Sequence, residues 1–201
     1  MKRKHNIFLL VLISILFILC SAKVFSQKFT PFHEYDFRKT NWGMSKEEVK
    51  LTEEGKPNYE NDVALLYEVK IDKYDCVCIY YFLENKLYRS AYIFTEKHVN
   101  KNAYIEDYEN LKELLTNKYG KATWENVNWI DDFYKDIKGN WGLAVARGDL
   151  EYIITWETSI TMVQMRLTGD NYKINLIIAY YSEELKDWAK EIQDKKSIKD
   201  L

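Results

Sequence analysis

The sequence is poor in proline, glycine and cysteine, and this scarcity excludes several classes of protein. Among 201 residues there are two prolines, seven glycines and three cysteines. So little proline and glycine argues against a collagen-like or low-complexity chain, and an aromatic content of 15% argues against disorder. Three cysteines cannot build the disulfide framework of a small secreted domain. A hydrophobic core must therefore stabilise the fold.

An excess of positive charge is also missing. Residues 1–26 carry four of the 29 basic residues and none of the 31 acidic ones, so residues 27–201 carry 25 basic and 31 acidic side chains, a formal charge of −6. Proteins that bind nucleic acid usually show a basic patch or stripe, which is the opposite balance. The composition therefore predicts no nucleic-acid partner.

The N-terminal segment has the pattern of an export signal. Three basic residues near the start are followed by an apolar run from Ile7 to Leu19, and small residues follow at Ala22 and Ser26. The run is about 13 residues long, whereas a bilayer core needs roughly 20. We expect a cleaved signal peptide at 1–26 and a periplasmic or secreted protein.

Other outcomes for this segment remain open. Cleavage after Ser26 would leave Gln27 at the N-terminus, and cleavage after Ala22 also fits the small-residue rule. Lipidation at Cys20 is a third possibility, although the residue before it is not small. The segment 7–20 could also remain as an uncleaved membrane anchor. Contact with a membrane is expected only in the last two cases.

Periodicity predicts a helix and three strands in the first half of the domain. Ser45 and Glu48 form the sequence pattern of a capping box, so a helix is expected from Lys46 to about Glu53. Alternating or apolar strands follow at 65–71, 76–83 and 86–95. Together they predict an antiparallel meander.

A similar order follows in the second half. A helical stripe predicts a helix over 103–118, and strands are expected at 150–157, 160–168 and 172–181. The predicted fold class is α+β, with two helix–three-strand meander units whose helices pack on one face of the sheet. We predict these segments: signal peptide 1–26, irregular lead-in 27–40, one domain 41–195 made of halves 41–98 and 99–182 plus a C-terminal helix 183–195, an irregular connection 121–148, a turn at 169–171, and a frayed tail 196–201.

Residues with catalytic or metal-binding chemistry are few. His33 and His98 have no nucleophile in a known local signature, and we expect both at the surface. Asp131, Asp132 and Asp136 form an acidic cluster without the spacing of a calcium loop. The sequence predicts no catalytic residue, no metal site and no cofactor. Carboxylates distant in sequence could still form a hydrolase site, which one sequence cannot reveal.

Cys76 and Cys78 lie two residues apart in an apolar strand, on the same face. Their Cα atoms are then roughly 6.5–7 Å apart, at the limit of an unstrained disulfide. We expect two core thiols; a strained or reactive pair is the alternative.

Aromatic residues are the main candidates for binding. Sixteen tyrosines and six tryptophans exceed the needs of a core of this size, so some should be exposed. Tyrosine and tryptophan are frequent hot-spot residues, and long connections on a rigid fold often carry function. The candidate binding residues in the 121–148 connection are Trp124, Trp129, Phe133, Tyr134 and Trp141.

The stretch Trp42–Val49 resembles the opening helix of a broad family of uncharacterised exported bacterial proteins. Tyr119-Gly120 and Trp156-Glu157-Thr158 match two further motifs of that family, which are structural. The helix-plus-sheet pattern is similar to outer-membrane assembly lipoproteins of the SmpA/OmlA type and, in its doubled form, to the beta-lactamase-inhibitor protein fold. These resemblances imply a protein-binding fold that is not an enzyme, and no functional residue transfers.

The function expected from all this is an exported, non-catalytic binding or envelope-assembly module. Its partner would be another envelope or secreted protein. A small-molecule or lipid-binding protein with a cavity between sheet and helices is the alternative, and a hydrolase with dispersed carboxylates is a further one.

Overall fold

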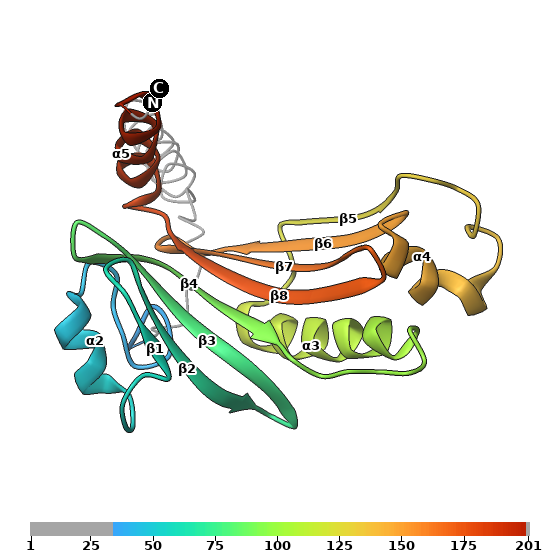
Figure 1. Ribbon diagram of the computed structural model, residues 1–201, viewed down its shortest axis with the longest axis horizontal. Coiled ribbons are helices and arrows are strands. Elements are labelled where there is room, and N and C mark those ends of the chain that lie inside the picture. Colours follow the sequence, from blue (N-terminus) through green and yellow to red (C-terminus); the bar gives the residue numbers. More distant parts are fainter. Residues whose placement is uncertain (1–33, 200–201) are drawn as a thin grey trace, which may run out of the picture. The chain divides into compact units, whose positions relative to one another are not determined.

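Strands from both halves of the chain form one antiparallel sheet, which a computed structural model describes over residues 34–199 (Figure 1). Eight strands of this part follow the order β1-β2-β3-β4-β8-β7-β6-β5, and every neighbouring pair is antiparallel. The α+β class is therefore confirmed. The elements are α2 (Lys46–Thr52), β1 (Tyr59–Glu60), β2 (Ala64–Ile71), β3 (Tyr74–Leu83), β4 (Lys86–Phe94), α3 (Ala103–Tyr119), β5 (Trp124–Trp129), a short 3₁₀ helix (Lys138–Asn140), α4 (Trp141–Arg147), β6 (Leu150–Glu157), β7 (Thr161–Asp170), β8 (Lys173–Ser182) and α5 (Lys186–Lys199).

Helix α2 begins where its capping box predicts. The Glu48 backbone N–H donates to Ser45 Oγ at 3.3 Å, and the Ser45 N–H donates to Glu48 Oε2 at 2.8 Å. Each bond satisfies a donor that the helix itself leaves unpaired. The capping-box prediction is confirmed.

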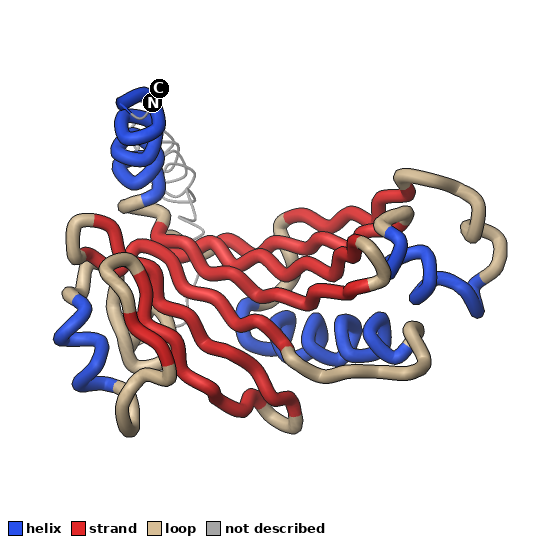
Figure 2. The backbone as a smooth tube through the Cα atoms, viewed as in Figure 1, coloured by secondary structure: helices blue, strands red, loops and turns tan. Residues whose placement is uncertain are grey.

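The core forms between one face of the sheet and the helices. Figure 2 shows the strands as a continuous sheet with α2, α3 and α4 beside it, whereas α5 projects away from it. Val49 of α2 and Leu111 of α3 are buried in the same cluster as the central sheet residues Tyr80 and Tyr180. Trp156 of β6 is also buried there, and its indole Nε1 donates to the Gly120 carbonyl at 3.1 Å. Each large apolar side chain that is buried in this way contributes roughly 1.5–3 kcal/mol.

The turn between β7 and β8 is a correction to the sequence prediction. It consists of Asn171 and Tyr172, whose φ angles are 48° and 63°, rather than residues 169–171. Gly169 lies within β7, where a Cβ would be 2.0 Å from the Val145 carbonyl oxygen. Glycine is needed at this position because a backbone passes close by, and the chain does not turn there.

Two other predictions are wrong. The 121–148 connection is not irregular, because it contains β5 and α4. The expected frayed tail at 196–201 is wrong for its first part, because α5 continues to Lys199. The predicted signal peptide, Cys20 and His33 lie outside the described residues.

Candidate functional site

Strand β5 is an edge strand of the sheet and carries two of the five predicted binding residues. It follows the end of α3 at Gly120, whose φ of 82° suits glycine. All six residues of β5 pair with β6, from Trp124 opposite Thr155 to Trp129 opposite Leu150. Five of the six are exposed, so β5 contributes little to the core. Its free edge faces outward from the sheet (Figure 1).

Helix α4 positions a third predicted residue, Trp141. The helix packs so closely on the start of α3 that a Cβ at Gly142 would lie 2.2 Å from the Lys101 carbonyl carbon. Asn102 joins the two elements, since its Oδ1 accepts from the Gly142 N–H at 2.6 Å and its Nδ2 donates to the Gly139 carbonyl at 2.8 Å. The aromatic ring of Trp141 is therefore held by a rigid contact between backbones.

The aromatic cluster, defined as Trp129, Phe133, Tyr134 and Trp141, is built from two ring pairs. Trp129 and Trp141 meet edge to face with centroids 5.7 Å apart, and Trp141 Nε1 donates to the Lys135 carbonyl at 3.0 Å. Phe133 and Tyr134 meet edge to face at 4.7 Å. Such arrangements stabilise by about 0.5–1.5 kcal/mol beyond the area that they bury.

A cation supports the second pair. The Arg147 guanidinium lies 5.9 Å from the ring centroid of Phe133 and 5.4 Å from that of Tyr134. Its Nε pairs with Asp149 Oδ2 at 2.9 Å. Arg147 was not among the predicted site residues, because nothing in its sequence neighbourhood points to the loop that it supports.

Trp124, the fifth predicted residue, lies apart from this cluster at the other end of β5. It lies five residue steps along the strand from Trp129, which is roughly 17 Å at the usual rise. It borders a groove of about 480 Å³ between the end of α3 and β5. The groove is lined by Lys112, Thr116, Gly120, Lys121, Ala122, Thr123, Trp124, Glu125 and Ile154.

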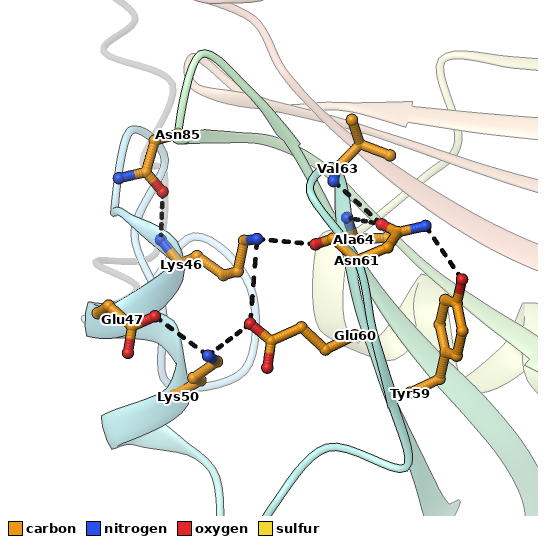
Figure 3. A network of polar contacts seen from close by, with 9 residues as sticks. All are labelled: Lys46, Glu47, Lys50, Tyr59, Glu60, Asn61, Val63, Ala64 and Asn85. Atoms are coloured by element: carbon orange, nitrogen blue, oxygen red, sulfur yellow. Dashed lines mark hydrogen bonds and ion pairs between the residues drawn. The ribbon is translucent and has the colours of Figure 1, made fainter.

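The opposite edge of the sheet is shielded, as Figure 3 shows. Strand β1 has only two residues. Lys50 of α2 reaches across to Glu60 at 2.6 Å, and Lys46 Nζ donates to the Asn61 carbonyl at 2.7 Å. Short strands and charged side chains are common means of preventing an edge from pairing with another chain. Strand β5 is three times as long and has one charged side chain, that of Glu125.

A partly buried ion pair next to α2 is the clearest polar cluster that the sequence analysis missed. Arg38 donates two hydrogen bonds to Glu53, at 2.7 and 3.0 Å, and the Tyr80 hydroxyl donates to the same carboxylate. The Glu53 side chain is 7% exposed. Since both carboxylate oxygens are engaged, the cluster anchors residues 36–40 to the sheet. Its partners lie 15 and 27 residues apart, a separation that leaves no local signal.

His98 is partly exposed, in line with the surface position expected for it, and its side chain contacts α3. Its Nε2 contacts Asp107 Oδ2 at 2.5 Å, and its ring meets Tyr104 edge to face. The contact joins the loop after β4 to α3. The His98 backbone N–H also donates to the Tyr104 hydroxyl at 3.2 Å, and Lys101 Nζ donates to the His98 carbonyl at 3.4 Å. Among residues 34–199, no serine or cysteine side chain hydrogen-bonds to the His98–Asp107 pair.

The two thiols are free and buried, as predicted. Burial raises the pKa of the Cys76 thiol to about 12, and burial also raises the pKa of Cys78. A thiol that stays protonated at neutral pH is a poor nucleophile.

Within the described part of the chain, no group of three or more His, Cys, Asp or Glu side chains is placed to hold a metal ion. No helix among residues 34–199 is long and apolar enough to span a bilayer. No family model, curated protein or solved structure matches this chain.

Proposed function

We propose that this protein is a non-catalytic binding or envelope-assembly module that acts outside the cytoplasm. Its partner is another envelope or secreted protein, which contacts the aromatic cluster and the loop around it. The export pattern of residues 1–26 supports the location. The saturated contacts of Glu53 and the high pKa of the Cys76 thiol support a role without chemistry.

One observation carries the proposal: exposed apolar side chains concentrate in one segment. Of the thirteen large hydrophobic residues that are exposed in the described part of the chain, five lie between residues 124 and 137. Exposed apolar side chains that gather in one region of a surface are typical of interaction sites. The five are Trp124 (51% exposed), Val127 (43%), Ile130 (62%), Phe133 (69%) and Ile137 (51%). The rigid packing of α4 beside them lowers the entropic cost of binding.

Capture from native envelope extract by cross-linking tests the proposal, with Phe133→Ala and Ile137→Ala compared against Leu51→Ala. Leu51 is the matched control, because it is 87% exposed on α2, far along the chain from the loop. Loss of a hot-spot aromatic costs about 2 kcal/mol or more, so we expect roughly 30-fold weaker binding of the captured partner to Phe133→Ala. Equal capture by all three variants would overturn the proposal.

A small-molecule ligand is the second candidate, and the groove beside Trp124 is the observation that favours it. Its volume of about 480 Å³ falls within the usual range of ligand sites. If a small molecule occupies the groove, native mass spectrometry of the exported chain should show the added mass of a bound ligand, and Trp124→Ala should lose it. If no ligand mass is seen and a protein partner is captured, the protein-binding function is favoured.

We also propose that the two halves are copies of one helix–three-strand unit. The order of the sheet supports this, since β2-β3-β4 and β6-β7-β8 follow one another and meet between β4 and β8. Native-state hydrogen exchange should then resolve two opening units, one for each half. A single opening free energy for all strands would contradict the repeat.

A further inference from the structure

The free edge of β5 offers a row of unpaired main-chain groups. Ile130 N–H donates to the Asp149 carbonyl at 2.7 Å, and the β5–β6 register places these two residues opposite each other. Because hydrogen-bonded residues alternate along an antiparallel strand, the main-chain groups of Glu125, Val127 and Trp129 point away from β6. Among the described residues no strand lies beyond β5 to receive them.

The sequence of this edge is partly symmetric about Val127, with one identical pair, one apolar pair and one pair that differs. It reads Trp-Glu-Asn-Val-Asn-Trp-Ile from Trp124 to Ile130. If the strand pairs antiparallel with itself about Val127, Asn126 lies opposite the second copy's Asn128. Trp124 then lies opposite the second copy's Ile130, so an amide meets an amide and an exposed apolar side chain meets another.

Charge selects the same register. Glu125 is the one charged residue in this stretch, and pairing about Val127 places it opposite the second copy's Trp129. Pairing about Glu125 would instead place two carboxylates opposite each other, which is destabilising. Pairing about Trp129 would place Val127 opposite the second copy's Asp131, so it would lose the apolar match.

We propose that two copies of this chain join through their β5 strands, antiparallel and centred on Val127, so that their sheets become continuous. About six main-chain hydrogen bonds form, two for each hydrogen-bonded residue pair. The interface lies at the low end of specific contact sizes, below about 1,200 Å², so a dissociation constant in the micromolar range is expected. The dimer would cover Trp124, Val127 and Ile130, which also belong to the proposed partner surface, whereas Phe133 and Ile137 lie outside the paired strand. Substitution of Phe133 therefore tests the proposed function without touching the strand that forms the dimer.

Disulfide trapping tests the register. Across the symmetry axis the two Val127 Cα atoms would be about 5.5 Å apart, within disulfide range, so Val127→Cys should form a covalent dimer under mild oxidation. Glu125→Cys is the matched control on the same face of the same strand. Its two copies would be roughly 13 Å apart, and trapping should be at least about tenfold slower. The native Cys76 and Cys78 are buried, and Cys20 is replaced by serine in both variants, so that the native thiols add no background.

Sedimentation velocity of the full chain, at concentrations from about 1 to about 200 µM, covers the range in which the dimer is expected to dissociate. Val127→Pro should sediment as a monomer throughout, because proline removes only the outward N–H and leaves the β5–β6 bonds intact. Val127→Thr should still dimerise. Equal trapping of both cysteine variants, or a native monomer at every concentration, overturns the dimer. A native monomer that gains a strand from an unrelated peptide also overturns it. Equal partner capture by Phe133→Ala and the native chain would overturn the proposed function alone, and the dimer would stand if the native chain still associates in sedimentation.

Discussion

Gly142→Ala should destabilise the protein more than any other single methyl addition to α4. The added Cβ would lie 2.2 Å from the Lys101 carbonyl carbon and 2.4 Å from the Asn102 nitrogen, both of which are backbone atoms. Ordinary contacts begin near 3.4 Å, so α4 must move by about 1.2 Å, the difference between 3.4 and 2.2 Å. That shift also breaks the bond from the Gly142 N–H to Asn102 Oδ1.

The expected cost combines overpacking, about 1–3 kcal/mol, with the loss of one buried hydrogen bond, about 1 kcal/mol. We therefore expect a loss of about 3 kcal/mol in the free energy of unfolding, or roughly 6–12 °C in melting temperature for a chain of this size. Urea denaturation monitored by tryptophan fluorescence measures this loss in the free energy of unfolding, since Trp129 and Trp141 report the docking of α4.

Gly139→Ala is the matched control. A Cβ at this position would have no atom within 4 Å, and the φ of Gly139 is not positive. The substitution should change stability by less than about 0.5 kcal/mol. If the two variants unfold at the same urea concentration, backbone contact at Gly142 does not hold α4 in place and the reasoning is refuted.

Three further predictions follow from other parts of the molecule. Ser45→Ala removes the capping hydroxyl of α2 and should cost about 1 kcal/mol in urea denaturation; an unchanged midpoint would show that the capping box contributes nothing. Raised pKa values in the folded state mean that the unfolded chain loses its thiol protons first. The stability from the neutral Cys76 thiol is thus complete below about pH 8.5 and falls as pH rises toward 12, by up to about 1.4 kcal/mol per pH unit. Unfolding at pH 8 to 11 should show a smaller slope for Cys76→Ala than for the native chain, and a thiol reagent should react with Cys76 at pH 8 only after unfolding. The exported chain should begin at Gln27 by intact mass; a start at Lys23, a lipidated Cys20 or a full-length chain would each identify a different fate for residues 1–26.

The elements predicted correctly from the sequence are those with a strong local period or a cap. The capping box at Ser45 and the helical stripe of α3 identified their helices within a residue of the observed bounds. Strand β5 was missed because its apolar residues, Trp124, Val127 and Trp129, do not share one face, and asparagine is uncommon in strands. It forms because β6 provides a ladder of partners, which is a tertiary effect.

Helix α4 was missed for a related reason. It has only seven residues, fewer than an isolated helix needs, and it has a glycine at its second position. Docking on α3 and β7 stabilises it instead. Four of the five predicted binding residues form two ring pairs, Trp129 with Trp141 and Phe133 with Tyr134. Trp124 joins neither pair, because the unexpected strand holds it at the far end. Whether these residues bind a partner stays a prediction.

Hydrogen exchange of the chain with and without its captured partner tests the central claim most directly, namely that the partner binds at the aromatic cluster. The account predicts slower exchange in residues 129–141, with no change in the shielded edge at 46–61 (Figure 3). Protection of 46–61 with unchanged exchange in 129–141 would place the partner on the opposite edge of the sheet and contradict the account.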